Sequence, residues 1–471
     1  MSKKIITSLL GTVLTVLLFA ALIMQSVFYI SLVQGKRDGS LPQFPESEMK
    51  LLANDISERN QGETSFLFPY FVGVISSDGM YAGSYDDSSA YEIFSLFAKV
   101  LENSPGGTAK KVVFSETEKK YEYLDSLYNS TDNCYYVKFR NGIEFSVICQ
   151  LVTDTYAKIP ENPDFVISDM FLISGLSGQA SIIAVDPYGN VLKIFPSKNI
   201  PFNNEYLQTY NNTEKEEFEF LKIKQNVGNN RNSYCPAFKF TKNYSIVESK
   251  PIEENFYINI DSSDLLELVN IFGMNADNTK FYRRSVDDAI LCVEDTTSFE
   301  ITADGNFKFT SGEDGGKLSS FFENSDIVDY TFFDYVSVGR KIADSLNQKM
   351  KESYAVLSLE GITYNLGECS FYYNYTIDGV PIENTGDHAL ELRFISDSLV
   401  YAEGQLEIMA YVGESKTEIP QRIAYVLMDK VSGPVLYFGP EYCFEETEEE
   451  QRKAFVRWTI KTESNDRGDR Q

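Results

Sequence analysis

The stretch from Ile5 to Gly35 carries no charged residue and is bounded by Lys3-Lys4 on one side and Lys36-Arg37 on the other. As an α-helix, at about 1.5 Å per residue, it would run for about 45 Å. A bilayer core about 30 Å thick needs only about 20 apolar residues. We therefore predict that residues 5–33 cross a membrane once and that the rest of the chain lies on one side of it.

Residues 5–33 have the features of an uncleaved signal anchor. A cleavable signal peptide has an apolar region of about 7–15 residues followed by a small-x-small cleavage site. Here the apolar region is longer, and the small residues near its end lack that spacing. The positive charges at its two ends are nearly equal, but long following domains are translocated largely regardless of charge. We expect a single-pass protein of the cell membrane, with its N-terminus in the cytoplasm and its ectodomain extracellular.

Small and polar residues within this segment recur at steps of three, four and seven, which places them on one stripe of a helix. The stripe consists of Ser8, Gly11, Thr12, Thr15, Leu22, Gln25 and Ser26. Such residues let transmembrane helices approach closely and hydrogen-bond to each other, and an amide facing lipid would be costly. We predict that the stripe is an interface with a partner helix. The alternative is that the hydroxyls bond their own backbone while Gln25 reaches out to the membrane surface.

The chain beyond residue 37 is strongly acidic. Four of the 42 basic residues flank the uncharged segment, which leaves 38 against 69 acidic residues and a net charge of −31. Such a surface repels nucleic acid and anionic lipid, so we expect no nucleic-acid partner. With 43% hydrophobic and 14% aromatic residues, the chain can still bury large cores, and its length predicts two or three domains.

The cysteines indicate buried thiols rather than a disulfide framework or a zinc site, because they are widely spaced and form no Cys-x-x-Cys pair. They are Cys134, Cys149, Cys235, Cys292, Cys369 and Cys443. The sequence also contains no phosphate-binding loop and no EF-hand pattern. We therefore expect no metal and no cofactor.

No residue pattern predicts a catalytic site. His388 is the only histidine, so a Ser-His-Asp or Cys-His arrangement could be built only around it, and we expect it to have a structural or surface role. Two alternatives to a protein without enzymatic activity remain open. One is a cell-wall hydrolase that uses two separated carboxylates, and the other is an anchored module that binds a wall glycan or peptide through exposed aromatic residues.

The hydrophobic periodicity beyond residue 47 changes repeatedly between short strands and amphipathic helices. It predicts an α+β fold: a transmembrane helix followed by a multi-domain ectodomain of mainly antiparallel sheets with packed helices. The elements that matter below are a helix from Ser88 or Ser89 to Leu101, strands at 135–139 and 143–148, strands at 170–173, 180–185 and 191–195, a loop at 203–232, a helix over 262–272, strands at 290–293, 298–302 and 307–310, and a helix at 331–351.

These elements suggest a division of the chain into seven segments. The predicted segments are a cytoplasmic start (1–4), a transmembrane anchor (5–33), a linker (34–46), an α+β N-terminal domain (47–165), a β-rich middle domain (166–330), an α+β C-terminal domain (331–461) and a disordered tail (462–471).

Three features together resemble one protein family. They are the single transmembrane helix close to the N-terminus, the meander from Phe299 to Phe309 (FEITADGNFKF), and the later stretch from Tyr372 to Ile382 (YYNYTIDGVPI). A helix over residues 339–351 lies between the last two. The sequence resembles the YycH/YycI family of Gram-positive bacteria, and its length and layout resemble the YycH branch.

The resemblance implies a membrane-anchored extracytoplasmic protein without enzymatic activity. Members of this family associate with, and modulate, the sensor histidine kinase of the essential cell-wall two-component system. Transmembrane helices carry part of that contact. The implied partners are therefore the membrane, the kinase and a paralogous YycI-like protein.

Overall fold

The described residues of this computed structural model all belong to one compact unit that extends from residue 59 to residue 471. They are residues 71–77, 79–83, 88–104, 107–130, 132–153, 161–175, 178–203, 216–224, 232–238, 243–250, 252, 258–260, 262–285, 288–312, 315–322, 330, 332–365, 368–383, 388–417, 435–446 and 452–462. Among them, no helix combines the length and the apolar character that crossing a membrane requires. The predicted anchor and its polar stripe lie outside these residues.

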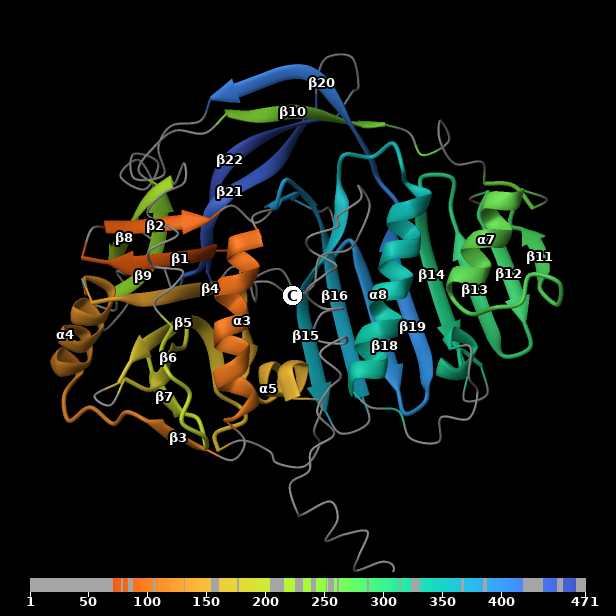
Figure 1. Cartoon of the computed structure of the whole chain (residues 1–471). Coiled ribbons are helices and arrows are strands. Elements are labelled where there is room, and N and C mark those ends of the chain that lie inside the picture. Colours follow the sequence, from red (N-terminus) through yellow and green to blue (C-terminus); the bar gives the residue numbers. More distant parts are fainter. Residues whose placement is uncertain are drawn as a thin grey trace, which may run out of the picture. The chain divides into compact units, whose positions relative to one another are not determined.

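The first sheet has nine antiparallel strands, all from the first half of the described chain (Figure 1). In spatial order they are β3 (Thr108–Lys111), β7 (Val191–Phe195), β6 (Ala180–Val185), β5 (Val166–Ser174), β4 (Cys134–Glu144), β1 (Phe71–Ser76), β2 (Gly79–Gly83), β8 (Glu216–Lys224) and β9 (Asn232–Phe238). The strands predicted at 180–185 and 191–195 are confirmed as β6 and β7.

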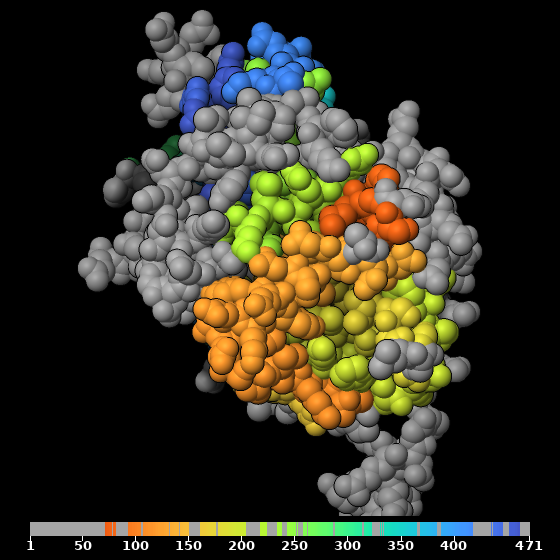
Figure 2. All heavy atoms as spheres, turned by 90° about the vertical axis from the view of Figure 1, so that its left-hand side faces the viewer, coloured from red at the N-terminus to blue at the C-terminus, as the bar shows by residue number. Residues whose placement is uncertain are grey.

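Side chains alternate between the two faces of the first sheet along each strand. Both faces contribute residues to a buried core. On β1, Val72 and Val74 join a core that includes residues of α3 (Ser88–Glu102) and α5 (Phe145–Thr153). Phe71 and Ile75 join a separate core with residues of α4 (Thr117–Tyr128). The space-filling view in Figure 2 shows α4, in orange, beside the strands that it covers.

The second sheet also has nine strands, and it contains both motifs that resemble the YycH/YycI family. In spatial order its strands are β11 (Lys280–Arg283), β12 (Ile290–Glu294), β13 (Thr297–Ile301), β14 (Asn306–Ser311), β19 (Ser398–Gln405), β18 (Leu390–Ile395), β16 (Glu368–Ile377) and β15 (Val356–Asn365), with β17 (Val380–Pro381) paired to β16. The meander forms the β13–β14 hairpin, in which Gly305 has a φ of +86°. That left-handed conformation explains the glycine at the turn.

Helices α7 (Ser263–Ile271) and α8 (Phe332–Lys349) and the short 3-10 helix η3 (Leu318–Phe321) accompany the second sheet. Ser262 caps α7 by accepting a hydrogen bond from the backbone N–H of Leu265, as its residue type favours. α8 buries Val338, Ile342 and Leu346 on one face, which is the face that the sequence predicts.

A third sheet of four strands draws on three separate parts of the chain. Its order is β20 (Ile408–Thr417), β10 (Asn243–Lys250), β22 (Arg452–Thr462) and β21 (Val435–Glu446). Val435 and Phe438 of β21 share a small core with Ile223 of β8 and Cys235 of β9. The late hairpin β21–β22 therefore packs against strands of the first sheet.

Two predicted elements are wrong. The strand expected at 143–148 ends at Glu144, and Phe145 begins helix α5. Phe145, Ile148 and Cys149 are all buried, and their spacing of three and four residues fits one face of a helix as well as a short buried strand. The loop expected at 203–232 contains β8, whose Phe218 and Ile223 are buried in two different cores.

The α+β class is confirmed, since antiparallel sheets with packed helices make up the described chain. The first sheet continues past the predicted boundary at residue 165, because β4 pairs with β5. The division into domains stays a prediction.

Candidate functional site

Polar side chains recur at every second residue of β4, whose other residues from Cys134 to Phe139 are apolar. Tyr136 and Lys138 are two residues apart and therefore point to the same face, and Arg140 follows at the same spacing. The side chains of Val137 and Phe139, between them, enter the core shared with α3 and α5. Lys138 is only 2% exposed, and a buried lysine requires a partner.

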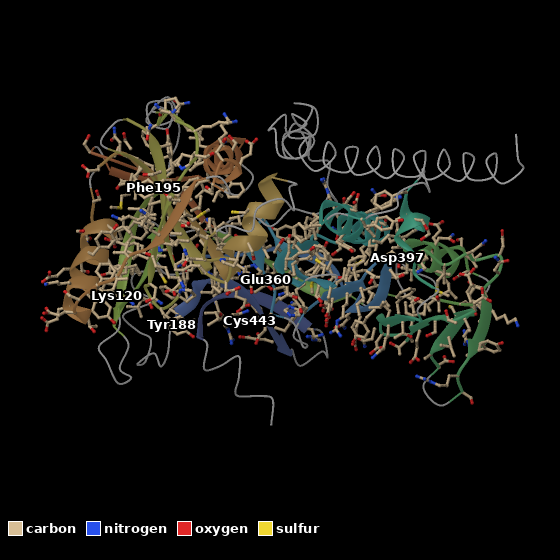
Figure 3. The ribbon with its side chains drawn as sticks, turned by 90° about the horizontal axis from the view of Figure 1, so that it is seen from below. Lys120, Tyr188, Phe195, Glu360, Asp397 and Cys443 are labelled. Carbon is tan, nitrogen blue, oxygen red and sulfur yellow. The ribbon has the colours of Figure 1, made fainter. Side chains whose placement is uncertain are left out.

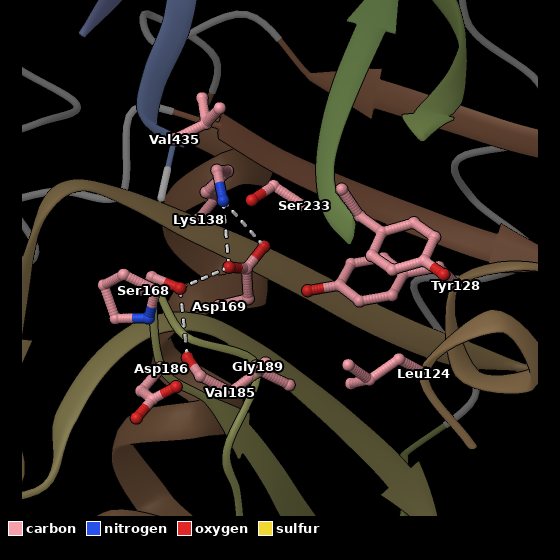
Figure 4. Close-up of a pocket in the computed structure, with 12 residues that line it drawn as sticks. Leu124, Tyr128, Lys138, Ser168, Asp169, Val185, Asp186, Gly189, Ser233 and Val435 are labelled. Carbon is pink, nitrogen blue, oxygen red and sulfur yellow. Dashed lines mark hydrogen bonds and ion pairs between the residues drawn. The ribbon is translucent and has the colours of Figure 1, made fainter. Parts of the chain in front are cut away.

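The partner of Lys138 is Asp169, the residue directly opposite it on β5. The ammonium nitrogen Nζ lies 3.0 Å from Oδ1 and 2.9 Å from Oδ2 of Asp169 (Figure 4). The hydroxyls of Tyr136 and Ser168 donate to the same carboxylate. Burial alone would lower the pKa of Lys138, but the charge and hydrogen bond of Asp169 and the nearby thiol of Cys235 together raise it.

This ion pair lines a small pocket whose empty volume, open solvent included, is about 290 Å³. Its wall includes Tyr128 of α4 and Tyr234 of β9, whose rings are stacked with centroids 4.2 Å apart. Figure 4 shows Tyr128 beside the carboxylate of Asp169. The hydroxyl of Tyr234 instead donates to Asp125, which also pairs with Lys222.

Two carboxylates, Asp169 and Asp186, line this pocket, which bears on the hydrolase alternative. Asp186 accepts hydrogen bonds of 2.6 Å from the backbone N–H and the side-chain amide of Asn190, and burial raises its pKa. Asp169 accepts donors from Lys138, Tyr136 and Ser168. Figure 4 shows the Asp186 carboxyl directed away from Asp169. These bonds give both carboxylates a role in holding the fold.

Arg140, two residues after Lys138 on β4, bonds to the second sheet. Its Nη1 lies 2.8 Å from Oε1 of Glu360 on β15, and the two side chains are only 10% and 9% exposed. Its guanidinium also lies 4.6 Å from the ring centroid of Tyr437 on β21, a distance at which a cation is attracted to an aromatic face. Side chains from all three sheets therefore meet at Arg140.

Glu360 is placed by a β-bulge. In the pairing of β15 with β16, Leu359 opposes Tyr373 and Gly361 opposes Tyr372, so Glu360 is the extra residue. Such a bulge redirects a side chain, and the second carboxylate oxygen of Glu360 accepts from the amide of Asn374.

The ion pair also controls the ionisation of Glu360. Burial would raise its pKa, but Arg140, and after it Lys461 and His388, lower the pKa below its usual value. Near Arg140 a second ion pair joins the strands of the third sheet: Nζ of Lys461 lies 2.7 Å from Oε1 of Glu441, which is 3% exposed. Two ion pairs, Arg140–Glu360 and Lys461–Glu441, therefore lie close together where the three sheets meet.

The residues singled out from the sequence do not gather into a site. The stripe from Ser8 to Ser26 lies outside the described residues and stays a prediction. The described cysteines are free thiols, and five of the six are buried, which confirms that expectation. His388 is partly exposed, and its ring lies 4.5 Å from that of Tyr372. In the part of the chain that the structure describes, no group of three or more His, Cys, Asp or Glu residues could hold a metal ion.

Sequence reasoning does not identify Lys138, Asp169, Arg140 or Glu360. The one available signal is the stretch Tyr135 to Arg140 (YYVKFR). In it, Lys138 and Arg140 alternate with apolar residues of the kind that strands usually bury. A lysine is almost never fully buried unless it is paired, so that alternation could have marked β4.

No family model and no curated protein matches this chain. Among solved structures, the chain is similar to YycH from Bacillus subtilis, with 9% identity, a TM-score of 0.49, and coverage of 86% of this chain and 95% of that one. An uncharacterized protein from Eubacterium rectale has 13% identity and a TM-score of 0.33, covering 51% of this chain and 84% of that one. The predicted resemblance is confirmed as a likeness to a solved YycH structure, and at these identities neither structure assigns a role to a residue of this chain.

Proposed function

We propose that this chain is a membrane-anchored extracytoplasmic regulator without enzymatic activity, which associates with and modulates a sensor histidine kinase controlling cell-wall metabolism. The observation that carries the proposal is the arrangement of the sequence. An uncharged segment with one polar stripe precedes a long acidic chain, and that chain contains the two motifs that resemble the YycH/YycI family.

The contacts of the second motif, residues 372–382, support a structural role for it. Asp378 and Gly379 both have positive φ and turn the chain between β16 and β17. Ile382, at the end of the motif, forms a bridge with Tyr442 of β21. The motif thus joins the second sheet to the third and has a structural role that does not depend on catalysis.

The mechanism we propose is a bias between two states of the partner. A bound protein shifts such an equilibrium only by the difference between its affinities for the two states. The stripe from Ser8 to Ser26 would supply the contact in the membrane through close helix packing and interhelical hydrogen bonds. The acidic ectodomain would remain outside the cell, where a YycI-like protein is a second candidate partner.

The test is co-purification of the full chain from detergent-solubilised membranes, with the kinase quantified in the bound fraction. Replacing Thr12, Thr15 and Gln25 together by Leu removes the polar stripe while keeping the segment apolar, and we expect kinase recovery to fall. The matched control changes Val13→Leu and Leu17→Ile, which the helical period assigns to the opposite side of the predicted helix, and it should leave recovery unchanged. Full recovery of the kinase with the Leu variant would refute the contact through the stripe.

A further inference from the structure

The ion pair between Arg140 and Glu360 joins two sheets at points where the strand pairing of each is irregular. Arg140 follows Lys138, after which the register between β4 and β5 shifts before it resumes at Ile143. Glu360 is the bulge residue of β15. In each strand, the residue whose side chain reaches the other sheet therefore lies where the pairing with its neighbouring strand is irregular. Bulges commonly redirect a side chain in this way.

The chemistry of this contact differs from that of its surroundings. Where α5 approaches α8 and β15 (Figure 1), Val147 and Ile148 of α5 belong to the same buried core as residues of α8 and β15. Figure 3 shows Glu360 between the elements that carry Lys120 and Tyr188 and those that carry Asp397. One part of the contact between the sheets is thus hydrophobic and the other is a buried pair of opposite charges.

These two kinds of contact respond differently to change. An apolar contact is non-directional and tolerates small shifts, whereas a buried ion pair keeps its energy only while both charges remain in good geometry. Buried pairs are also weak sources of stability compared with apolar residues of similar volume. Net stabilisation alone therefore does not account for an Arg–Glu pair at this position.

We propose that Arg140 and Glu360 form a releasable latch between the first and the second sheet, with the apolar contact around α5 acting as the hinge. When the pair is closed, the sheets keep one fixed arrangement. When it opens, the sheets turn about α5, and Arg140 keeps only its contact with Tyr437 of β21, a strand that packs against the first sheet. The protein would then have two arrangements that a partner can bias, although the latch itself does not depend on which partner binds.

The test measures the separation of the two sheets in the full chain held in lipid nanodiscs. Spin labels are placed at Val113→Cys, beside β3 and 90% exposed, and at Tyr282→Cys, on β11 and 52% exposed, in a Cys443→Ser background. Distances between the labels are then measured by double electron–electron resonance. The variant Glu360→Gln removes the negative charge and leaves the size of the side chain unchanged.

We expect Glu360→Gln to add a second distance to that of the parent protein. The milder variant Arg140→Lys keeps the positive charge but loses the planar contact with Tyr437, and it should produce the same second distance in a smaller fraction of molecules. If Glu360→Gln fails to fold, the distances measured in Arg140→Lys test the latch. The matched control is Glu300→Gln, which removes the acid of an Arg284–Glu300 pair of 2.6 Å with side chains 46% and 34% exposed, and it should leave the distances unchanged.

Two results would overturn the latch. One is a folded Glu360→Gln or Arg140→Lys protein whose distance distribution matches that of the parent. The other is an equal change in the Glu300→Gln control, which would show that loss of any Arg–Glu pair loosens the protein.

Discussion

Arg140 on β4 and Glu360 on β15 are 220 residues apart in the chain, yet their side chains form an ion pair of 2.8 Å that is about nine-tenths buried. Lys138, two residues earlier on β4, forms a more deeply buried pair with Asp169, in which both side chains are 3% exposed. Strand β4 thus pairs with its neighbour β5 through Lys138, and it contacts the second sheet through Arg140. The measurements below follow from this arrangement.

Replacing one member of the Arg140–Glu360 pair should cost much more than replacing both. Arg140→Met leaves a buried carboxylate without its cation, and such losses reduce the free energy of unfolding by about 3–5 kcal/mol. The double variant Arg140→Met with Glu360→Leu should recover most of that loss, since apolar replacements of buried pairs are often neutral. Urea unfolding measures both values. Additive costs in the double variant would contradict the pairing.

Lys138 should be far more sensitive to substitution than an exposed lysine with the same kind of partner. Lys138→Met leaves Asp169 buried and uncompensated, with an expected loss of about 3–5 kcal/mol. The comparison is Lys317→Met, because Lys317 and Asp397 form a 3.0 Å pair with side chains 38% and 49% exposed, and exposed pairs contribute about 0–1 kcal/mol. Thermal and urea unfolding of the two variants should differ clearly, and equal losses would be inconsistent with the buried pair.

The stability of the protein should fall in acid partly through Glu360. Burial would raise the pKa of Glu360, but Arg140, Lys461 and His388 together hold it below its ordinary value of 4.5 in the folded chain. A lowered pKa contributes stability that is fully present above the unfolded pKa and is lost as the pH falls through the folded one. The free energy of unfolding of Glu360→Gln, measured from pH 7 downward, should therefore lack this part of the acid-dependent loss. Parallel curves for the two proteins would argue against it.

Cys443 should be the first of the described thiols to react with an alkylating reagent in the native protein. Burial raises the pKa of Cys134, Cys149 and Cys292 to about 12, and a thiol must be deprotonated to act as a nucleophile. The pKa of Cys443 is also about 12, raised by burial and nearby acids, but its side chain is partly exposed. Mass spectrometry after timed alkylation should find slow labelling at Cys443 first, and Cys443→Ser should remove it. Faster labelling at Cys134 would contradict the burial described here.

Much of the local structure could be predicted from the sequence. The strands β6 and β7, the turn between them, the β13–β14 hairpin and helix α8 follow from short-range periodicity and from turn residues such as Gly189 and Gly305. Both glycines have positive φ, a conformation that other residues rarely adopt. Helix α5 could not be predicted, because a buried apolar run of this length fits a helix face and a strand equally well.

The sequence by itself determined the uncharged segment from Ile5 to Gly35, the acidic balance and the turns, since each depends on residues that are neighbours in the chain. Only the tertiary structure decided which charges meet. Asp169 and Glu360 are two of 69 acidic residues, and nothing near them in the chain distinguishes them. They become partners of Lys138 and Arg140 because strand order, register and one bulge bring distant segments together in a place that excludes water, where an unpaired charge is too costly to remain.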